Sequence, residues 1–125
     1  MKEDEKEEGS ILATGSWLML NRPLFTKLGI DSAVLLADLI SKQIFFRKRK
    51  SLTKEGFFFN EKDDIERGTT LSFYRQQKAL EILVGEGLVE TKKHGTPQRV
   101  FYRVDIKFVN RYILQLCEET EEDDE

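Results

Sequence analysis

Apolar residues recur at helical spacing in three stretches of the chain. Residues 31–50 predict a first helix, with Asp31 or Ser32 as its N-cap, from the spacing of Leu35, Leu36, Leu39, Ile40 and Gln43. Residues 72–85 predict a second helix, between Ser72 as N-cap and two glycines that follow at positions 85 and 87. A third helix begins near Ile106, and its single apolar stripe consists of Val109, Tyr112, Ile113 and Leu116.

Shorter elements fill the intervals between these helices. Residues 11–23 predict an extended N-terminal strand, because the apolar run from Trp17 to Leu20 is followed closely by Pro23. The sequence FFF at 57–59 predicts a short strand. Residues 60–67 predict a short helix with Asn60 as its N-cap, and the sequence GTT at 68–70 predicts a turn. Residues 88–104 predict a β-hairpin, whose loop HGTPQ contains the glycine and proline typical of longer hairpin loops.

This order of elements predicts the fold class. A pair of helices joined by a turn and followed by a β-hairpin is typical of a winged helix. We therefore expect an α+β fold, mainly α: a winged helix-turn-helix with a β-hairpin wing, an N-terminal strand and a C-terminal helix. Residues 11–117 form its single domain. The acidic ends, 1–10 and 118–125, are predicted to be disordered because like charges repel and nothing in them can be buried.

The net charge of -3 conceals an uneven distribution along the chain. Residues 1–10 carry a charge of −3 and residues 118–125 a charge of −7, which leaves +7 for residues 11–117. A basic domain favours a polyanionic partner such as nucleic acid, since association depends on the local field rather than on the total charge. The acidic C-terminal tail either keeps the protein soluble or competes with DNA phosphates for the basic surface.

The helix at 72–85 has a gradient of side-chain types that favours DNA recognition. On a helical wheel, one face is apolar throughout, while long hydrogen-bonding side chains gather on the opposite face in the first turns. The first turns of a recognition helix enter the major groove, where Arg and Lys bind guanine and Gln pairs with adenine. The candidate DNA contacts on this helix are Ser72, Tyr74, Arg75, Gln77 and Lys78.

The hairpin adds a second set of candidate contacts. Its loop and the adjoining strands are basic, and such a wing lies along the DNA backbone or enters the minor groove. Lysine-rich hairpins also occur simply to block edge pairing, so this alternative stays open. The candidate residues here are Lys92, Lys93, His94, Thr96, Gln98 and Arg99, with Arg103 behind them. The run RKRK at 47–50 either adds a phosphate contact or only ends its helix.

Residues 56–105 resemble the winged-helix domain of phage and plasmid replication proteins, of the replisome-organiser and initiator type. The resemblance lies in the aromatic strand, in LSFYRQQKAL, in GLVE, and in the wing GTPQRVFYRVD, and it covers about residues 16–106. It implies a phage- or plasmid-type DNA-binding protein of bacteria or archaea, with contacts from the same helix and wing. That family usually has glycine where this chain has Thr70, and an aliphatic residue where it has Gln76, which we expect to be partly buried. Replisome organisers carry further domains, so we expect a compact transcriptional regulator or replication accessory factor.

Other classes of function find little support in the sequence. His94 is the single histidine and Cys117 the single cysteine, so neither a catalytic triad nor a zinc site can be assembled, and Asp63 and Asp64 suit the start of a helix. We expect no cofactor, no metal, no enzymatic activity, and a cytoplasmic protein without a membrane span. The alternative is a protein-interaction winged helix, an adaptor or inhibitor of a host protein that uses the acidic tails or the C-terminal helix. That helix packs on its own domain or pairs with a second copy, and we favour a homodimer.

Overall fold

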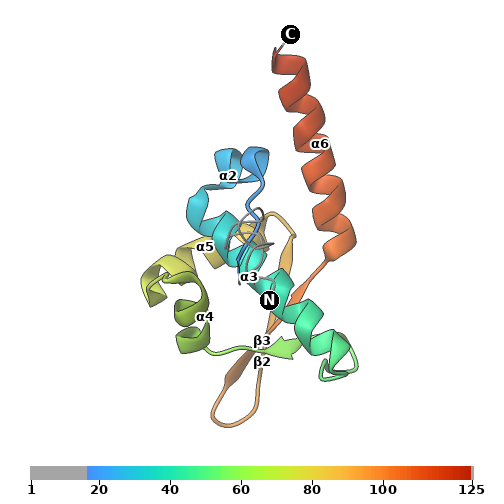
Figure 1. Ribbon diagram of the computed structural model, residues 1–125. Helices are drawn as coiled ribbons and strands as arrows, with labels where there is room; N and C mark the ends of the chain where they lie inside the picture. Colours follow the sequence, from blue (N-terminus) through green and yellow to red (C-terminus); the bar gives the residue numbers. More distant parts are fainter. Residues whose placement is uncertain (1–16, 125) are drawn as a thin grey trace, which may run out of the picture.

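The computed structural model describes residues 17–124, which form a mainly helical domain with a small antiparallel sheet (Figure 1). Its elements in chain order are α2 (Arg22–Leu28), α3 (Ile30–Lys48), β1 (Phe58–Phe59), α4 (Lys62–Thr69), α5 (Phe73–Gly85), β2 (Val89–His94), β3 (Arg99–Val104) and α6 (Ile106–Asp124). This order is compatible with the α+β, winged-helix-like arrangement predicted from the sequence.

Helix α3 is the centre of the core. Its apolar side chains are buried on two sides, because it packs against α2, α4 and α5 and also against β3. Leu35, Leu36 and Leu39 are almost fully inaccessible to solvent. The helix starts one residue earlier than expected, with Gly29 as N-cap at a φ of 98° that favours glycine. The prediction of Asp31 or Ser32 as the cap is therefore wrong, and both residues lie in the first turn.

The predicted N-terminal strand is absent from the part of it that the structure describes. Residues 17–21 form no strand, and Asn21 instead caps α2 by accepting a hydrogen bond from the backbone N–H of Leu24 at 2.9 Å. Pro23 lies in the first turn of this helix, where its missing N–H costs nothing. The apolar run before it remains exposed, and Met19 keeps 71% of its surface accessible to solvent. Residues 11–16 lie outside the described part of the chain, as does the predicted acidic tail at 1–10.

The three strands form a sheet in the order β1-β3-β2. The predicted hairpin is confirmed, with Glu90 opposite Arg103 and His94 opposite Arg99, and β1 adds Phe58 opposite Tyr102. Because side chains alternate along a strand, Phe58 and Tyr102 face the helices, while their neighbours face away from them. The second face of the sheet, which we call the outer face, carries Phe57, Phe59, Glu90, Lys92, His94, Arg99, Phe101 and Arg103.

The side chain of Gln43 joins α3 to the end of β3. Its Nε2 donates to the carbonyl oxygen of Val104 at 3.0 Å, and its Oε1 accepts from the backbone N–H of Val104 at 2.8 Å. Strand β1 begins only at Phe58, opposite Tyr102, so it does not reach Val104. The amide of Gln43 therefore takes the place of a strand partner inside the core, where an unpaired backbone group would be costly.

The connection between α4 and α5 differs in detail from the predicted turn. Glu61, rather than Asn60, is the N-cap of α4, and Asn60 is buried and accepts a hydrogen bond from Nζ of Lys42 at 3.5 Å. Gly68 lies inside the helix, so the connection is shifted to residues 70–72. Thr70 begins it as the C-cap of α4, in the left-handed region at a φ of 65°.

Replacing Thr70 with glycine is expected to raise the free energy of unfolding by about 1 kcal/mol, because a β-branched residue is strained at positive φ and glycine is not. Urea denaturation followed by circular dichroism measures this change. Thr69 serves as the control, because its hydroxyl donates to the carbonyl of Ile65 and accepts from the N–H of Leu71. Thr69→Gly should therefore destabilise the protein, and a loss of stability in Thr70→Gly as well would contradict the argument.

Helix α6 packs on α2 through the predicted apolar stripe, in which Val109 and Leu116 are buried and Tyr112 and Ile113 half-buried. The hydroxyl of Tyr112 donates to a carboxylate oxygen of Glu86 at 2.8 Å, and burial together with this carboxylate raises the pKa of Tyr112 to about 12. The helix continues to Asp124, whereas we expected residues 118–125 to be disordered. In Figure 1, its C-terminal end lies at the opposite end of the molecule from the hairpin loop. None of the helices between residues 17 and 124 is long and apolar enough to cross a membrane.

Candidate nucleic-acid interface

Helix α5 presents its first turns to solvent, as predicted. Ser72 is the N-cap and accepts a hydrogen bond from the backbone N–H of Arg75 at 3.3 Å. Tyr74 is 69% exposed, and Nζ of Lys78 lies 5.6 Å from the centre of its ring, so the two side chains form one cationic, aromatic surface. Gln77 is also exposed, one turn from Tyr74 toward the hairpin.

Arg75 is also exposed, but it already has a partner within the protein. Its Nε and Nη2 donate to the two carboxylate oxygens of Asp31, at 2.8 and 2.7 Å. The hydrogen bond from Arg75 lowers the pKa of Asp31, and Asp31 correspondingly raises the pKa of Arg75. The bidentate geometry fixes the guanidinium plane relative to the start of α3. Sequence reasoning missed Asp31, because 44 positions separate the two residues and no local pattern links them.

Two residues of α5, Gln76 and Phe73, have a burial that does not follow from their polarity. Gln76 is only 6% exposed, and its Nε2 donates to the carbonyls of Lys62 at 3.0 Å and Leu71 at 2.9 Å. The expectation of a partly buried, hydrogen-bonded Gln76 is thus confirmed, and its amide ties α4 to the start of α5. Phe73, an apolar residue in the first turn of α5, is nevertheless 50% exposed, and Nζ of Lys62 lies 4.6 Å from the centre of its ring.

The six candidate residues of the hairpin are all exposed, but strand alternation sends them to different faces. Lys93 shares its face with Thr91 and points toward α5. Lys92 and His94 lie on the outer face, together with Arg99, which pairs with His94 in the register. Thr96 and Gln98 lie in the loop between the strands. Arg103 is not part of the tip, because it donates to the backbone carbonyl of Glu55 at 2.6 Å and forms an ion pair with Glu90.

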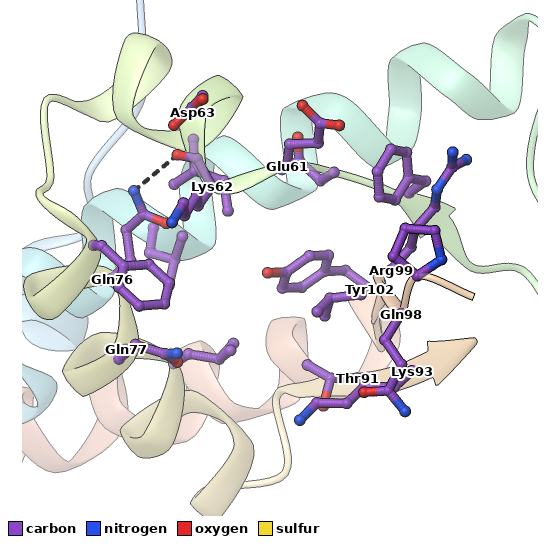
Figure 2. A pocket seen from close by; sticks show the side chains of 18 residues that line it. Glu61, Lys62, Asp63, Gln76, Gln77, Thr91, Lys93, Gln98, Arg99 and Tyr102 are labelled. Carbon is purple, nitrogen blue, oxygen red and sulfur yellow. Dashed lines mark hydrogen bonds between the residues drawn. The ribbon is translucent and has the colours of Figure 1, made fainter. Parts of the chain in front are cut away.

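A groove of about 670 Å³ separates α5 from the hairpin (Figure 2). Gln76 and Gln77 line one wall, Thr91, Lys93, Gln98 and Arg99 line the other, and Glu61 to Asp63 close one end. Tyr102 lies at the centre, and burial raises the pKa of its hydroxyl. The structure thus brings Gln77 together with Lys93, Gln98 and Arg99 around one groove, whereas Lys92, His94 and Thr96 do not line it. Ser72, Tyr74, Arg75 and Lys78 do not line it and belong to the open face of α5.

The structure assembles no metal-binding cluster from the residues that it describes, since no three His, Cys, Asp or Glu side chains converge there. His94 contacts the ring of Phe101 edge-on, at 6.3 Å between ring centres. Cys117 is half-buried on α6 beside Leu116. Asp64 forms an ion pair with Arg67 one turn later in α4.

The chain matches no known family model and no curated protein sequence. A solved structure described as the N-terminal domain of a DNA binding protein has a similar fold, with a TM-score of 0.60. The likeness covers 83% of this chain and 79% of the other, at 15% sequence identity. At this identity, the likeness shows a shared fold and nothing more.

Proposed function

We propose that this chain is a winged helix that binds double-stranded DNA, with α5 in the major groove and the hairpin as a wing on the backbone or in the minor groove. The observation that carries the proposal is the exposed surface of Tyr74, Gln77 and Lys78 at the start of α5, beside a hairpin with exposed cations. Recognition helices use these positions and these residue types. The charge of +7 over residues 11–117 and the similar fold of a described DNA binding protein also support it.

The proposed contacts divide by chemistry. Lys78 and Gln77 have donors directed to solvent, and we assign them to hydrogen bonds with base edges. The backbone N–H groups in the first turn of α5, next to Ser72, suit a phosphate oxygen. Arg75 uses two of its five N–H groups on Asp31, so the two on Nη1 and the second one on Nη2 remain for DNA. Lys93, Thr96 and Gln98 approach the neighbouring stretch of backbone from the hairpin. Binding is proposed to be sequence-specific, because a guanidinium held in one plane discriminates between bases better than a mobile one.

The biological setting is proposed from the sequence resemblance. A phage- or plasmid-type transcriptional regulator or replication accessory factor, working in the cytoplasm without catalysis, fits a compact basic domain of this kind. A homodimer through α6 would place two recognition helices on successive major grooves, about one helical turn apart. Sedimentation experiments that measure the mass of the protein alone and of its complex with a two-site duplex test that arrangement.

On random-sequence duplex DNA, where these two cations contact phosphates rather than a chosen base, Arg75→Ala/Lys78→Ala is expected to weaken binding and to flatten its salt dependence. Each lost phosphate contact should lower the slope of log K against log salt by about one, whereas a lost base contact lowers affinity without changing the slope. Fluorescence anisotropy over a salt series measures both quantities. Lys107→Ala/Arg111→Ala removes the same charge from exposed positions of α6 and should change binding much less.

Asp31→Asn is the companion variant to this pair. It frees Arg75 and removes one negative charge beside α5, so binding to random DNA should become tighter and its salt slope steeper. If the intact protein does not bind duplex DNA at low salt, the proposed function is wrong.

A protein-binding role is the second candidate, and one feature of α6 favours it. Leu114 is 63% exposed on the face opposite the packed stripe, between Arg111 and Glu118. In Figure 1, the second half of α6 extends beyond the rest of the domain. Leu114→Glu should abolish capture of a protein partner while leaving DNA binding unchanged. The reverse result would assign α6 to the DNA-binding function.

A further inference from the structure

The outer face of the sheet is unusually aromatic for a surface that no helix within residues 17–124 covers. Phe57, Phe59 and Phe101 all lie on it, and Phe59 and Phe101 form a cross-strand pair with 5.7 Å between ring centres. The uncovered face of an antiparallel sheet normally carries polar residues. Phe59 and Phe101 are only half-buried, so part of each ring is accessible to solvent.

Cations surround these rings. The guanidinium of Arg99 lies 5.2 Å from the centre of the Phe59 ring, and Nζ of Lys92 lies 5.7 Å from that of Phe57. The exposed run at 47–50 ends α3, and the loop after it leads to the edge strand β1. The backbone N–H of Thr53 donates to the carbonyl of Phe57 at 2.8 Å, and Arg103 donates to the carbonyl of Glu55.

Internal stability accounts for only one end of this surface. Phe57 is buried beneath Arg103, whose guanidinium is 4.6 Å from the ring centre and forms an ion pair with Glu90, so these residues hold the sheet together. The hairpin end is different. Arg99 and His94 are exposed there, and neither has an acidic partner among the residues that the structure describes.

We propose that the outer face binds single-stranded DNA, whose bases stack on Phe59 and Phe101 while Arg99, Lys92 and the basic run at 47–50 contact its phosphates. Exposed rings beside a row of cations are the two components of single-strand binding surfaces. A duplex does not fit this chemistry, because its bases are already stacked on one another and present no free ring face. The hairpin then has two functional sides: Lys93 faces the groove beside α5, and His94 faces the single strand. Arg99 lies where the two meet, since Arg99 and Phe59 also line an edge of the groove. This inference stands independently of the proposed duplex binding.

The test is the binding of a fluorescent oligothymidylate of about 12 nucleotides, a length within the range of known single-strand sites. Phe59→Leu/Phe101→Leu keeps apolar side chains in both positions but removes the ring faces. We expect its affinity to fall at least about tenfold with an unchanged salt slope, since stacking carries no charge. Arg99→Gln should lower both the affinity and the slope. Arg75→Ala/Lys78→Ala, on the other side of the hairpin, should bind oligothymidylate like the unaltered protein.

The outcomes separate the two proposals. Failure of the intact protein to bind oligothymidylate at low salt overturns the single-strand site, whatever happens with duplex DNA. Equal affinity of the double leucine variant and the intact protein also overturns it, because binding would then rest on charge alone. Binding to oligothymidylate that is lost in the leucine variant, together with no duplex binding, would support this site and refute the proposed duplex function.

Discussion

Gln43→Leu is expected to lower the free energy of unfolding by about 3 kcal/mol. The leucine would keep the apolar contacts of α3 but would leave both the N–H and the carbonyl of Val104 without partners in the core. An unpaired buried polar group costs about 1–3 kcal/mol, and two are created here. Because Val104 ends the strand that leads from the hairpin into α6, the loss should also loosen the position of the hairpin relative to α5.

Urea denaturation followed by circular dichroism measures this loss. Gln115→Leu is the matched control, since the same substitution at an exposed position of α6 should change stability by less than about 0.5 kcal/mol. If Gln43→Leu were as stable as the unaltered protein, the amide would not be replacing a strand partner. Water would then have to form the hydrogen bonds to Val104 that the amide of Gln43 forms in the unaltered protein.

Gly68→Ala is expected to destabilise the protein by about 2 kcal/mol, although alanine is the better helix former. A Cβ at this position would lie 2.8 Å from Oδ1 of Asp38, closer than atoms can approach without movement. Asp38 is buried on α3 and is held by Nζ of Lys42 at 2.8 Å, and Lys42 also donates to the carbonyl of Asp64 at 3.3 Å. Forcing the two helices apart therefore disturbs an ion pair as well as packing, and overpacking alone costs about 1–3 kcal/mol.

Gly85→Ala provides the opposite expectation in the same chain. Gly85 is the last residue of α5, and an added Cβ would meet nothing within 4 Å. This substitution should leave stability unchanged or raise it by up to about 1 kcal/mol, through helix propensity alone. Similar changes for the two variants in thermal or urea denaturation would show that contact with Asp38 does not decide the identity of residue 68.

Periodicity predicted the elements whose burial follows a regular pattern. Helices α3, α5 and α6 and the hairpin all appear where apolar spacing placed them, since one face of each packs on the core. Helix α2 was not predicted, although Asn21 and Pro23 together form a recognisable helix start. The apolar run from Trp17 to Leu20 outweighed that signal, yet most of this run is exposed. An apolar run therefore predicted burial that the tertiary structure does not provide.

The candidate interface was predicted residue by residue, but its internal contacts were not. Exposure of Tyr74, Gln77 and Lys78 follows from their positions on a helix. The burial of Gln76 was expected because the family that the sequence resembles usually has an aliphatic residue at that position. The ion pair of Arg75 with Asp31 and the link from Gln43 to Val104 join residues that are 44 and 61 positions apart. Such contacts depend on how helices are placed in space, which local spacing does not encode. Strand alternation predicts which hairpin residues share a face. It does not predict that one face borders the groove beside α5 and that the other lies beside the phenylalanines of the outer face, because that depends on how β1 pairs with β3.

The position of α6 gives the molecule a permanent electrical polarity. Its C-terminal end, where the acidic run from Glu118 begins, lies far from the hairpin with its lysines and arginines (Figure 1). A polyanion would exert a torque on such a charge distribution and turn the basic end forward before contact, and this orientation raises productive encounter rates at low ionic strength. The acidic segment would then orient the approaching protein through electrostatic repulsion from the polyanion, without contacting it.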